Sequence, residues 1–343
     1  MKLGPVNGLP GALTTVVLVV VILATTAGVI WLSRRRTFMN TSTVADAYDR
    51  WTEDQLLERL WGEHVHLGHY GDLPSRRLSV DFRDAKRDLV HNLVAWSGLD
   101  QLPRGSRVLD VGCGIGGSAR ILARDYGFQV LGISISPAQI ARARELTPVD
   151  PSIQCSFAVM NALALQLSDG SFDAVWSVEA GPHMPDKQNY ADELLRVLKP
   201  GGLLVVADWN RRDATAGEMS GVERWVMRQL LDQWAHPEFA SIPSLQRNLE
   251  GSRWSGGMVV STDDWTDATL PSWIDSIAEG FRRPMAVLGL GPGALIKGLR
   301  ETPTLLLMDW AFRHGLMKFG VFRGRKPQSA QGHPSVEARF VRG

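Results

Sequence analysis

The stretch VLDVGCGIGGSAR, from Val108 to Arg120, decides the fold of this chain. Its apolar start predicts a buried strand over 107–111, its glycines predict a tight turn, and a helix is expected over 117–126. Glycine adopts backbone dihedrals that other residues avoid and lets the backbone pass close to a ligand. The pattern therefore predicts a ligand site at the carboxyl end of a strand in an α/β sheet.

Asp110 lies near the end of the predicted strand, two residues before the first glycine of the turn. A carboxylate at this place suits a ligand that carries an ammonium group. The N–H groups that open the following helix have no partner within it and can bind another part of the ligand. This combination indicates S-adenosylmethionine as the cofactor.

The same turn also matches a dinucleotide-binding fingerprint, because Gly112, Gly114 and Gly117 fit G-x-G-x-x-G. Two features disfavour a nicotinamide or flavin cofactor. Asp110 would place negative charge near a pyrophosphate, and the second predicted strand ends at Ser134 instead of the acidic residue that binds a ribose. S-adenosylmethionine is therefore the favoured cofactor.

Composition is typical of a globular enzyme, with 21% charged and 8% aromatic residues among 343. The formal net charge is +1 and no long basic stripe is present, so a nucleic-acid partner is not expected. No protein partner is predicted either. The two cysteines, Cys113 and Cys155, are expected to be free thiols in a reducing compartment. Nothing has zinc-ligand spacing, and no metal site is predicted.

The N-terminus differs from the rest of the chain. Residues 12–32 carry no charge and would span about 31 Å as a helix, which is close to the thickness of a bilayer core. Three arginines, 34–36, follow directly, which places the downstream domain on the cytoplasmic side of a plasma or thylakoid-type membrane. A cleaved signal peptide is the alternative, with small residues at 24–27, but the long run and its charge bias disfavour it. Residues 1–36 are therefore predicted to be a membrane anchor.

Downstream of residue 106 strands and helices alternate, which predicts a doubly wound, mostly parallel sheet. Strands are expected at 107–111, 129–133, 153–159, 172–178 and 202–208, and helices at 117–126, 137–146 and 189–198. The predicted regions are a linker and N-terminal helical cap (37–105, with the linker at 37–45), a cofactor-binding core (106–210), a helical cap over the substrate (211–303), a final helix and strand of the core (304–327) and a disordered tail (328–343). Gly256 to Ser261 is a possible strand, and LGLGPGALI, from Leu288 to Ile296, is expected to be a loop or a broken helix.

Four stretches carry a family resemblance: WGEHVHLGHYG (61–71), LDVGCGIGGSAR (109–120), FDAVWSVEAGPHMPDK (172–187) and LMDWAFRHGLMKFGVF (307–322). On these motifs the chain resembles the class I S-adenosylmethionine-dependent methyltransferases, whose fold is a seven-stranded sheet. Within them it resembles the prenylquinol methyltransferases of tocopherol and plastoquinone synthesis, and most of all the cyanobacterial type. The resemblance covers about residues 44–327.

The resemblance implies a set of cofactor contacts. Asp110 and the backbone of the turn would hold the methionine end, Ser134 would lie near the ribose, and Asn161 with Ala162 would meet the adenine. The remaining predicted contacts are Gly112, Cys113, Gly114, Gly116, Ile133 and Val178. Many class I enzymes have acidic residues where this chain has Ser134 and Asn161, and Asn161 could instead be a plain turn residue.

The resemblance also implies the reaction, which is methylation of a ring carbon in 2-methyl-6-phytyl-1,4-benzoquinol or its solanesyl counterpart. A neutral ring carbon is a weak nucleophile, but loss of a hydroxyl proton, with a pKa of about 10 by analogy with tyrosine, enriches the ortho carbon in electrons. A general base is therefore needed. His183 is the first candidate, with a purely structural histidine as the alternative. Glu179 is expected to orient His183, contact the cofactor or cap the loop.

Other residues are expected to serve the substrate. The segment with His64, His66, His69 and Tyr70 would fold over the active site and contact the quinol hydroxyls, or else be a packed linker. Some of the tryptophans Trp225, Trp234, Trp254, Trp265, Trp273 and Trp310, together with 288–296, would line a route for the prenyl tail. The basic residues Arg282, Arg283, Lys297 and Arg300 could face anionic lipid headgroups.

Two further functions remain open on the sequence. One is a γ-tocopherol or sterol-type methyltransferase, because the tocopherol enzymes share the WGEH and HMP motifs. The other is a membrane-tethered regulator that binds S-adenosylmethionine without turnover.

Overall fold

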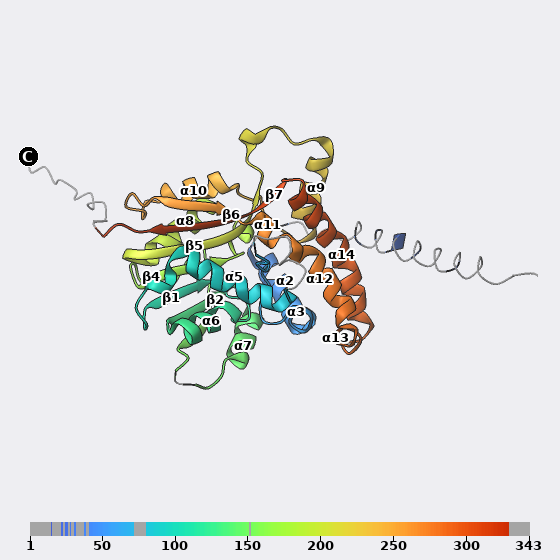
Figure 1. Cartoon of the computed structure of the whole chain (residues 1–343), viewed down its shortest axis with the longest axis horizontal. Coiled ribbons are helices and arrows are strands. Elements are labelled where there is room, and N and C mark those ends of the chain that lie inside the picture. Colours follow the sequence, from blue (N-terminus) through green and yellow to red (C-terminus); the bar gives the residue numbers. More distant parts are fainter. Residues whose placement is uncertain are drawn as a thin grey trace, which may run out of the picture.

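The computed structural model describes residues 41–71, 80–150 and 152–328, together with isolated positions between 15 and 38. Its centre is a seven-stranded sheet in the order β3-β2-β1-β4-β5-β7-β6 (Figure 1). The strands are β1 (Arg107–Val111), β2 (Gln129–Ser134), β3 (Cys155–Val159), β4 (Phe172–Val178), β5 (Leu198–Arg211), β6 (Val260–Asp264) and β7 (Met317–Arg325). Strands β1 to β5 are parallel, and β7 runs antiparallel to β5 and β6. The predicted doubly wound, mostly parallel sheet is confirmed.

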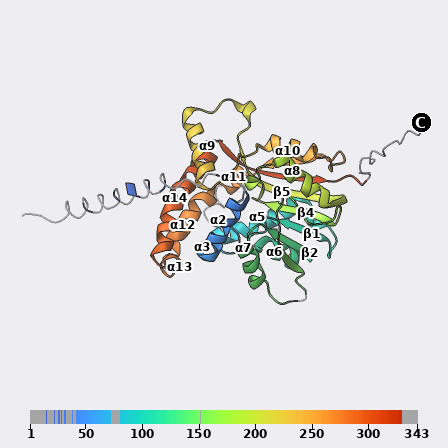
Figure 2. The same ribbon diagram turned by 180° about the vertical axis from the view of Figure 1, so that it is seen from behind.

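Helices cover both faces of the sheet (Figures 1 and 2). One face packs against α5 (Phe82–Ser97), α6 (Gly117–Tyr126) and α7 (Pro137–Leu146), and the other against α8 (Lys187–Val197) and α10 (Ile242–Glu250). Packing on both faces requires that successive side chains of a strand point to opposite faces, and strand β5 shows this alternation. Leu203 and Val205 enter the first cluster, whereas Leu204 and Val206 enter the second.

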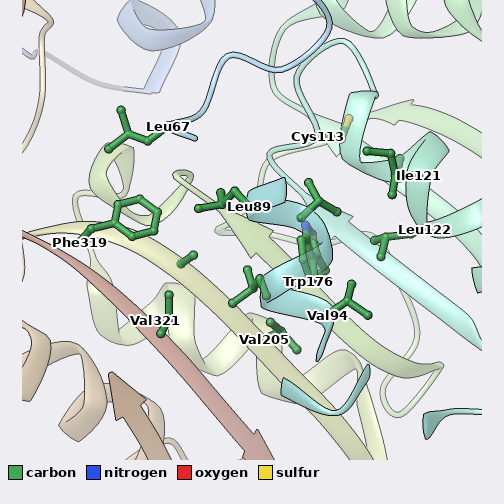
Figure 3. Close-up of a cluster of buried hydrophobic side chains, with 14 of the residues drawn as sticks. Leu67, Leu89, Val94, Cys113, Ile121, Leu122, Trp176, Val205, Phe319 and Val321 are labelled. Carbon is green, nitrogen blue, oxygen red and sulfur yellow. The ribbon is translucent and has the colours of Figure 1, made fainter. Parts of the chain in front are cut away.

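The larger core lies between the sheet and helices α5 and α6 (Figure 3). Trp176 of β4 is fully buried there, and Leu89 and Val94 of α5 and Leu122 of α6 pack around it. Helix α5 begins where the side chain of Asp81 accepts hydrogen bonds from two backbone N–H groups, and it ends at a glycine in the left-handed conformation. The local sequence thus fixes the length of the helix that covers this core.

The remaining helices gather beyond the carboxyl ends of the parallel strands and form the cap (Figure 1). They are α2 (Thr41–Glu53), α3 (Leu56–Trp61), α9 (Gly221–Gln233), α11 (Thr266–Thr269), α12 (Pro271–Arg282), α13 (Pro284–Leu288) and α14 (Pro292–Arg313). Three short 3₁₀ turns, η1 (Leu99–Gln101), η2 (Gly181–His183) and η3 (Ala214–Ala216), complete the described elements. The cap therefore draws on both the N-terminal and the C-terminal half of the chain.

The predicted regional boundaries need correction. Residues 211–303 do not form only a cap, since α10 and β6 belong to the core and β6 is the edge strand of the sheet. The boundary at 303/304 falls inside the continuous helix α14, and the predicted linker 37–45 includes the first turn of α2. The 288–296 stretch is a break between two helices, as one of the two expectations had it.

No helix in the described part of the chain is long and apolar enough to cross a membrane. The predicted membrane helix at about 12–32 falls largely outside the described residues. The predicted tail covers 328–343, and only its first residue is among the described ones.

Leu93 provides a test of the core. Its side chain is fully buried in α5, so Leu93→Ala removes apolar contacts and leaves a cavity. We expect the free energy of unfolding to fall by about 2–5 kcal/mol, measured by guanidinium unfolding. Val149→Ala is the control, because Val149 is fully exposed, and should change the free energy by less than about 0.5 kcal/mol. Equal losses in the two variants would contradict this description of the core.

Candidate functional site

A cavity with about 1920 Å³ of empty space, its open mouth included, lies between the carboxyl ends of β1, β2 and β4 and the cap. One half is bounded by the glycine-rich turn after β1. The other half is lined mainly by aromatic and apolar side chains of the cap. The two halves therefore differ in the chemistry that they offer to a ligand.

The glycine-rich turn has the conformation that its sequence predicts. Gly112, Gly114 and Gly116 have φ values of 77°, 54° and 83°, in the left-handed region. A Cβ on Gly112 would lie 2.5 Å from Cβ of Ala180, so only glycine fits at this close approach. A Cβ on Gly114 would meet nothing within 4 Å, and Gly114 lines the cavity. Gly116 does not line it and instead precedes α6.

Asp110 is the charged group beneath this turn. Its side chain is buried, with 2% of the residue exposed, and Oδ2 has no hydrogen-bond partner. Burial raises the pKa of the carboxyl to about 7, although a bond from the backbone of Ala119 acts the other way. A buried carboxylate that lines a cavity and keeps one oxygen without a partner fits the ammonium group of S-adenosylmethionine.

The predicted nucleoside contacts also reach the cavity. Ile133, Ser134, Asn161, Ala162 and Val178 line it, and so does Cys113. Both cysteines are free thiols, as expected.

The polar side chains at this end also have structural bonds. Ser134 Oγ donates to Oε1 of Gln139 at 2.7 Å, and Oδ1 of Asn161 accepts from the amide of Leu163 at 2.9 Å. The turn role that was the alternative for Asn161 is therefore present, and contact with the cofactor stays a prediction for both residues. Gln139 also lines the cavity and was not singled out in the sequence.

The loop after β4 is held from both sides. The amide of Gly181 donates to Oδ1 of Asp208 at 3.2 Å, and a Cβ at Gly181 would collide with that carboxylate. Nζ of Lys187 donates to the carbonyls of Gly181 and Met184 at 2.8 and 2.5 Å. These bonds fix the short turn that carries His183 into the cavity.

The ring of His183 is held by two residues that the sequence did not indicate. The hydroxyl of Tyr48, on α2, lies 2.7 Å from Nε2 of His183, and the ring of His236 stacks on it with centroids 4.3 Å apart. Burial lowers the pKa of His183 to about 3, with a smaller effect of Lys187, so the imidazole is neutral. Nδ1 of His183 and Nδ1 of His236 are both buried without a partner.

Glu179 has a different role from orienting His183. Its Oε1 accepts the amide of Leu67 at 2.7 Å, and its own backbone has a φ of 56°, which is strained for a residue other than glycine. Burial raises the pKa of its carboxyl to about 7, opposed by the Leu67 bond and by Lys86. Tyr48, and not Glu179, holds the ring of His183.

The 61–71 segment folds over the cofactor turn, as one expectation had it. His64 and His66 line the cavity, with His64 Nδ1 and His66 Nε2 3.1 Å apart. A Cβ on Gly117 would lie 2.5 Å from the carbonyl oxygen of Glu63, so this segment passes directly over the start of α6.

The other two members of that segment lie elsewhere. The ring of His69 packs against Trp265, and the amide of Tyr70 donates to the carbonyl of Ala268 at 2.8 Å. Neither lines the cavity, so neither contacts a substrate in it. Across the described ranges, no group of three or more His, Cys, Asp or Glu side chains is arranged to hold a metal ion.

The apolar half of the cavity is a chamber of tryptophans, but not the predicted set. Of the six predicted tryptophans only Trp234 and Trp273 line it, and none of the side chains described in 288–296 does. Trp51, Trp61 and Trp209 line it instead, with Val44, Leu57 and Leu305. The sequence does not show which apolar residues meet across the cap.

Comparison with known proteins identifies relatives of the chain. The family description "Methyltransferase domain" matches residues 109–206. A 2-methyl-6-phytyl-1,4-hydroquinone methyltransferase of Synechocystis sp. is 55% identical over 90% of this chain and 95% of its own length. The chloroplastic tocopherol O-methyltransferase of Arabidopsis thaliana is 31% identical over 79% of each chain.

A solved structure shares the fold. The phosphoethanolamine N-methyltransferase 2 of Haemonchus contortus, in complex with S-adenosyl-L-methionine, is 19% identical with a TM-score of 0.66. The match covers 83% of this chain and 60% of that one.

Asp110 predicts a pH-dependent affinity. Below pH about 7 its carboxyl holds a proton in the free protein, and that proton must leave before an ammonium group can bind. We expect the affinity for S-adenosylhomocysteine to fall as the pH drops from about 8 to about 6, approaching about tenfold per unit. Isothermal titration calorimetry in buffers of different ionisation enthalpy measures both the affinity and the released proton.

Two variants identify the titrating group. Asp110→Asn should bind weakly at every pH and lose the pH dependence. Glu179→Gln is the matched control, since the pKa of Glu179 is also raised to about 7, and it should keep the dependence. A dependence that persists in Asp110→Asn and disappears in Glu179→Gln would overturn the assignment.

Proposed function

The chain belongs to the S-adenosylmethionine-dependent methyltransferases, and we propose that it methylates a ring carbon of a prenylated 1,4-benzoquinol. The substrate would be 2-methyl-6-phytyl-1,4-benzoquinol or its solanesyl counterpart, in tocopherol or plastoquinone synthesis. The observation that carries this proposal is the divided cavity. An unpartnered carboxylate lies in one half, a tryptophan-lined chamber forms the other, and two unpartnered imidazole nitrogens border the cavity.

Asp110 and the turn at Gly112 and Gly114 would hold the amino-acid end of the cofactor, and Ser134 and Asn161 would flank its nucleoside. When bound, the cofactor supplies an electrophilic methyl group. The chain itself must hold the quinol ring in line with that group, and alignment of this kind can supply several kcal/mol of the barrier reduction.

His183 is the proposed general base. The neutral imidazole can accept the hydroxyl proton at Nδ1 while Nε2 stays bonded to the Tyr48 hydroxyl. A pKa of about 3 makes the free ring a weak base. A phenolate forming beside the ring would raise that pKa, because an opposite charge favours the imidazolium. Stacking on His236 keeps the ring in place during the transfer.

The tryptophan chamber suits the prenyl tail. Apolar burial stabilises a bound chain by about 0.8 kcal/mol per CH₂ group, so even part of the tail contributes substantially to binding. Trp209 packs against Trp273 with ring centroids 5.4 Å apart, which gives the chamber rigid walls.

Membrane attachment is the second part of the proposal. The predicted helix over about 12–32 would anchor the chain, with the catalytic domain on the cytoplasmic side. Trp31, near the end of that stretch, is buried, and its indole donates to Oγ1 of Thr304 on α14 at 2.8 Å. Leu305, the next residue, lines the cavity. This contact supports an entry for a lipid substrate close to the anchor.

His183→Ala tests the base. Loss of a positioned base should lower kcat by about 10²–10⁴-fold with little change in affinity for S-adenosylhomocysteine. The control His314→Ala removes an exposed histidine at the end of α14 and should leave kcat unchanged. A loss of only a few-fold in His183→Ala would assign His183 a structural role.

Substrate identity is tested by product analysis. Purified full-length protein is mixed with labelled S-adenosylmethionine and with liposomes that contain 2-methyl-6-phytyl-1,4-benzoquinol. We expect the label to appear in this quinol. It should act far more slowly on γ-tocopherol, which the 31% identical tocopherol enzyme makes the second candidate. Preference for γ-tocopherol would favour that candidate, and binding without any labelled lipid would favour a regulator.

Removal of residues 1–27 tests the anchor while keeping Trp31. We expect the shortened protein to leave the membrane fraction on salt washing and to keep its turnover on a short-tailed quinol in solution. Full retention in membranes after salt washing would show that the predicted helix is not the attachment.

A further inference from the structure

A second groove lies on the outer side of the cap and shares no lining residue with the cavity. It lies between α3, the start of α5, and the α12–α13 junction. Its lining residues are Glu58, Arg59, Arg83, Arg282, Arg283, Pro284, Met285 and Ala286. Guanidinium groups from three separate parts of the chain therefore converge on one concave surface.

The carboxylates near this groove are already engaged. Glu58 receives two bonds from Arg142, at 2.6 and 2.8 Å, from outside the groove. Glu279, which is buried, pairs with Arg282 at 3.1 Å and with Arg283 at 2.7 Å. Arg282 also pairs with Asp275 at 2.9 Å. Little negative charge is left for the other two arginines.

Arg59 and Arg83 pair with no carboxylate in the described part of the chain. Arg83 donates to the carbonyls of Arg59 and Leu60, at 2.6 and 3.3 Å, and its Nε is buried without a partner. Among the residues that the structure describes, the guanidinium of Arg59 bonds only the amide side chain of Gln55, at 3.5 Å. The groove therefore has an excess of positive charge from guanidinium groups, which fits an anion with several acceptor oxygens.

A highly exposed apolar side chain lines the groove, and another directly precedes a lining residue in the sequence. Met285 is 74% exposed and lines the groove, and Phe281, directly before Arg282, is 82% exposed. Large apolar side chains are seldom this exposed in a cluster unless they contact a partner or a membrane. A free anion would make no use of them, whereas a lipid has both an anionic headgroup and chains.

We propose that this groove binds the phosphate headgroup of an anionic membrane lipid, with the lipid chains over Phe281 and Met285. The site is separate from methyl transfer and from the predicted anchor. It turns the α12–α13 side of the cap toward the bilayer surface. Arg282 and Arg283 were expected to face lipid headgroups, and the groove adds Arg59 and Arg83 to them. Lys297, which was expected to do the same, lines the cavity instead and pairs with Asp54.

Thermal unfolding of the full-length protein in neutral detergent tests the site. Phosphatidylglycerol, phosphatidylcholine or inorganic phosphate is added to separate samples, and all samples have the same ionic strength. Phosphatidylglycerol should raise Tm, because a ligand that binds only the folded state stabilises it, and the other two should not. Arg59→Gln should weaken the phosphatidylglycerol response about tenfold in concentration.

The matched control is Arg253→Gln. Arg253 is 69% exposed and follows α10, which lies far from α13 in both views (Figures 1 and 2). This variant should respond to phosphatidylglycerol like the native protein. Met285→Ser should lose part of the same response, because the chains lose their contact.

Three results would overturn the proposal. Inorganic phosphate could match phosphatidylglycerol, which would make the groove a free-anion site. Phosphatidylcholine could match it, which would remove the headgroup specificity. Arg59→Gln could respond like the control, which would place binding elsewhere. Methyl transfer measured on the same samples reports on the proposed function separately.

Discussion

The carboxylate of Glu179 holds the two halves of the site together. It follows β4, takes a left-handed backbone that turns the chain toward His183, and accepts the amide of Leu67. That bond fastens the 61–71 segment over the glycine-rich turn. It is thus the direct link between the roof over the cofactor half and the strand that leads into the loop with the proposed base.

Buried charge is the main electrostatic cost of this arrangement. Asp110, Glu179 and Asp208 have raised carboxyl pKa values, and Lys86 and Lys187 have lowered ammonium pKa values, all mainly because of burial. Each buried ion costs several kcal/mol unless a partner compensates for it. Lys187 and Asp208 attract each other across the loop at Gly181, and Asp110 and Asp208 each keep one buried oxygen without a partner. Of these two carboxyl groups only Asp110 lines the cavity, where the cation of a ligand would compensate for it.

The sequence predicted the core better than the cap, for a physical reason. Strands such as β1 and β4 are buried on both faces and bounded by glycine or polar turns, so their bounds follow from local pattern. β6 was placed too early, at 256–261, because its VSTDD sequence is polar at an exposed edge. The break between α13 and α14 left two interpretations open, since Gly and Pro occur both in loops and at helix starts.

The candidate site was predictable only where one segment holds it. Asp110 and the glycines lie in one motif, and His183 follows one strand. Tyr48 and His236 reach His183 from opposite parts of the chain, and nothing local connects them. The tryptophans show the same limit, because helical spacing marks a buried face but does not identify what that face meets.

Helix α2 has a consequence for the order of events at the site. Asp49 accepts bonds from the hydroxyl of Ser136 and the amide of Ala138 beside the nucleoside end, and Tyr48 bonds His183 at the proposed base. Any swing of α2 that opens a path for nucleoside exchange also removes the Tyr48 hydroxyl from the imidazole. Through neighbouring residues, the helix therefore couples the backbone beside the nucleoside end to the imidazole of the proposed base.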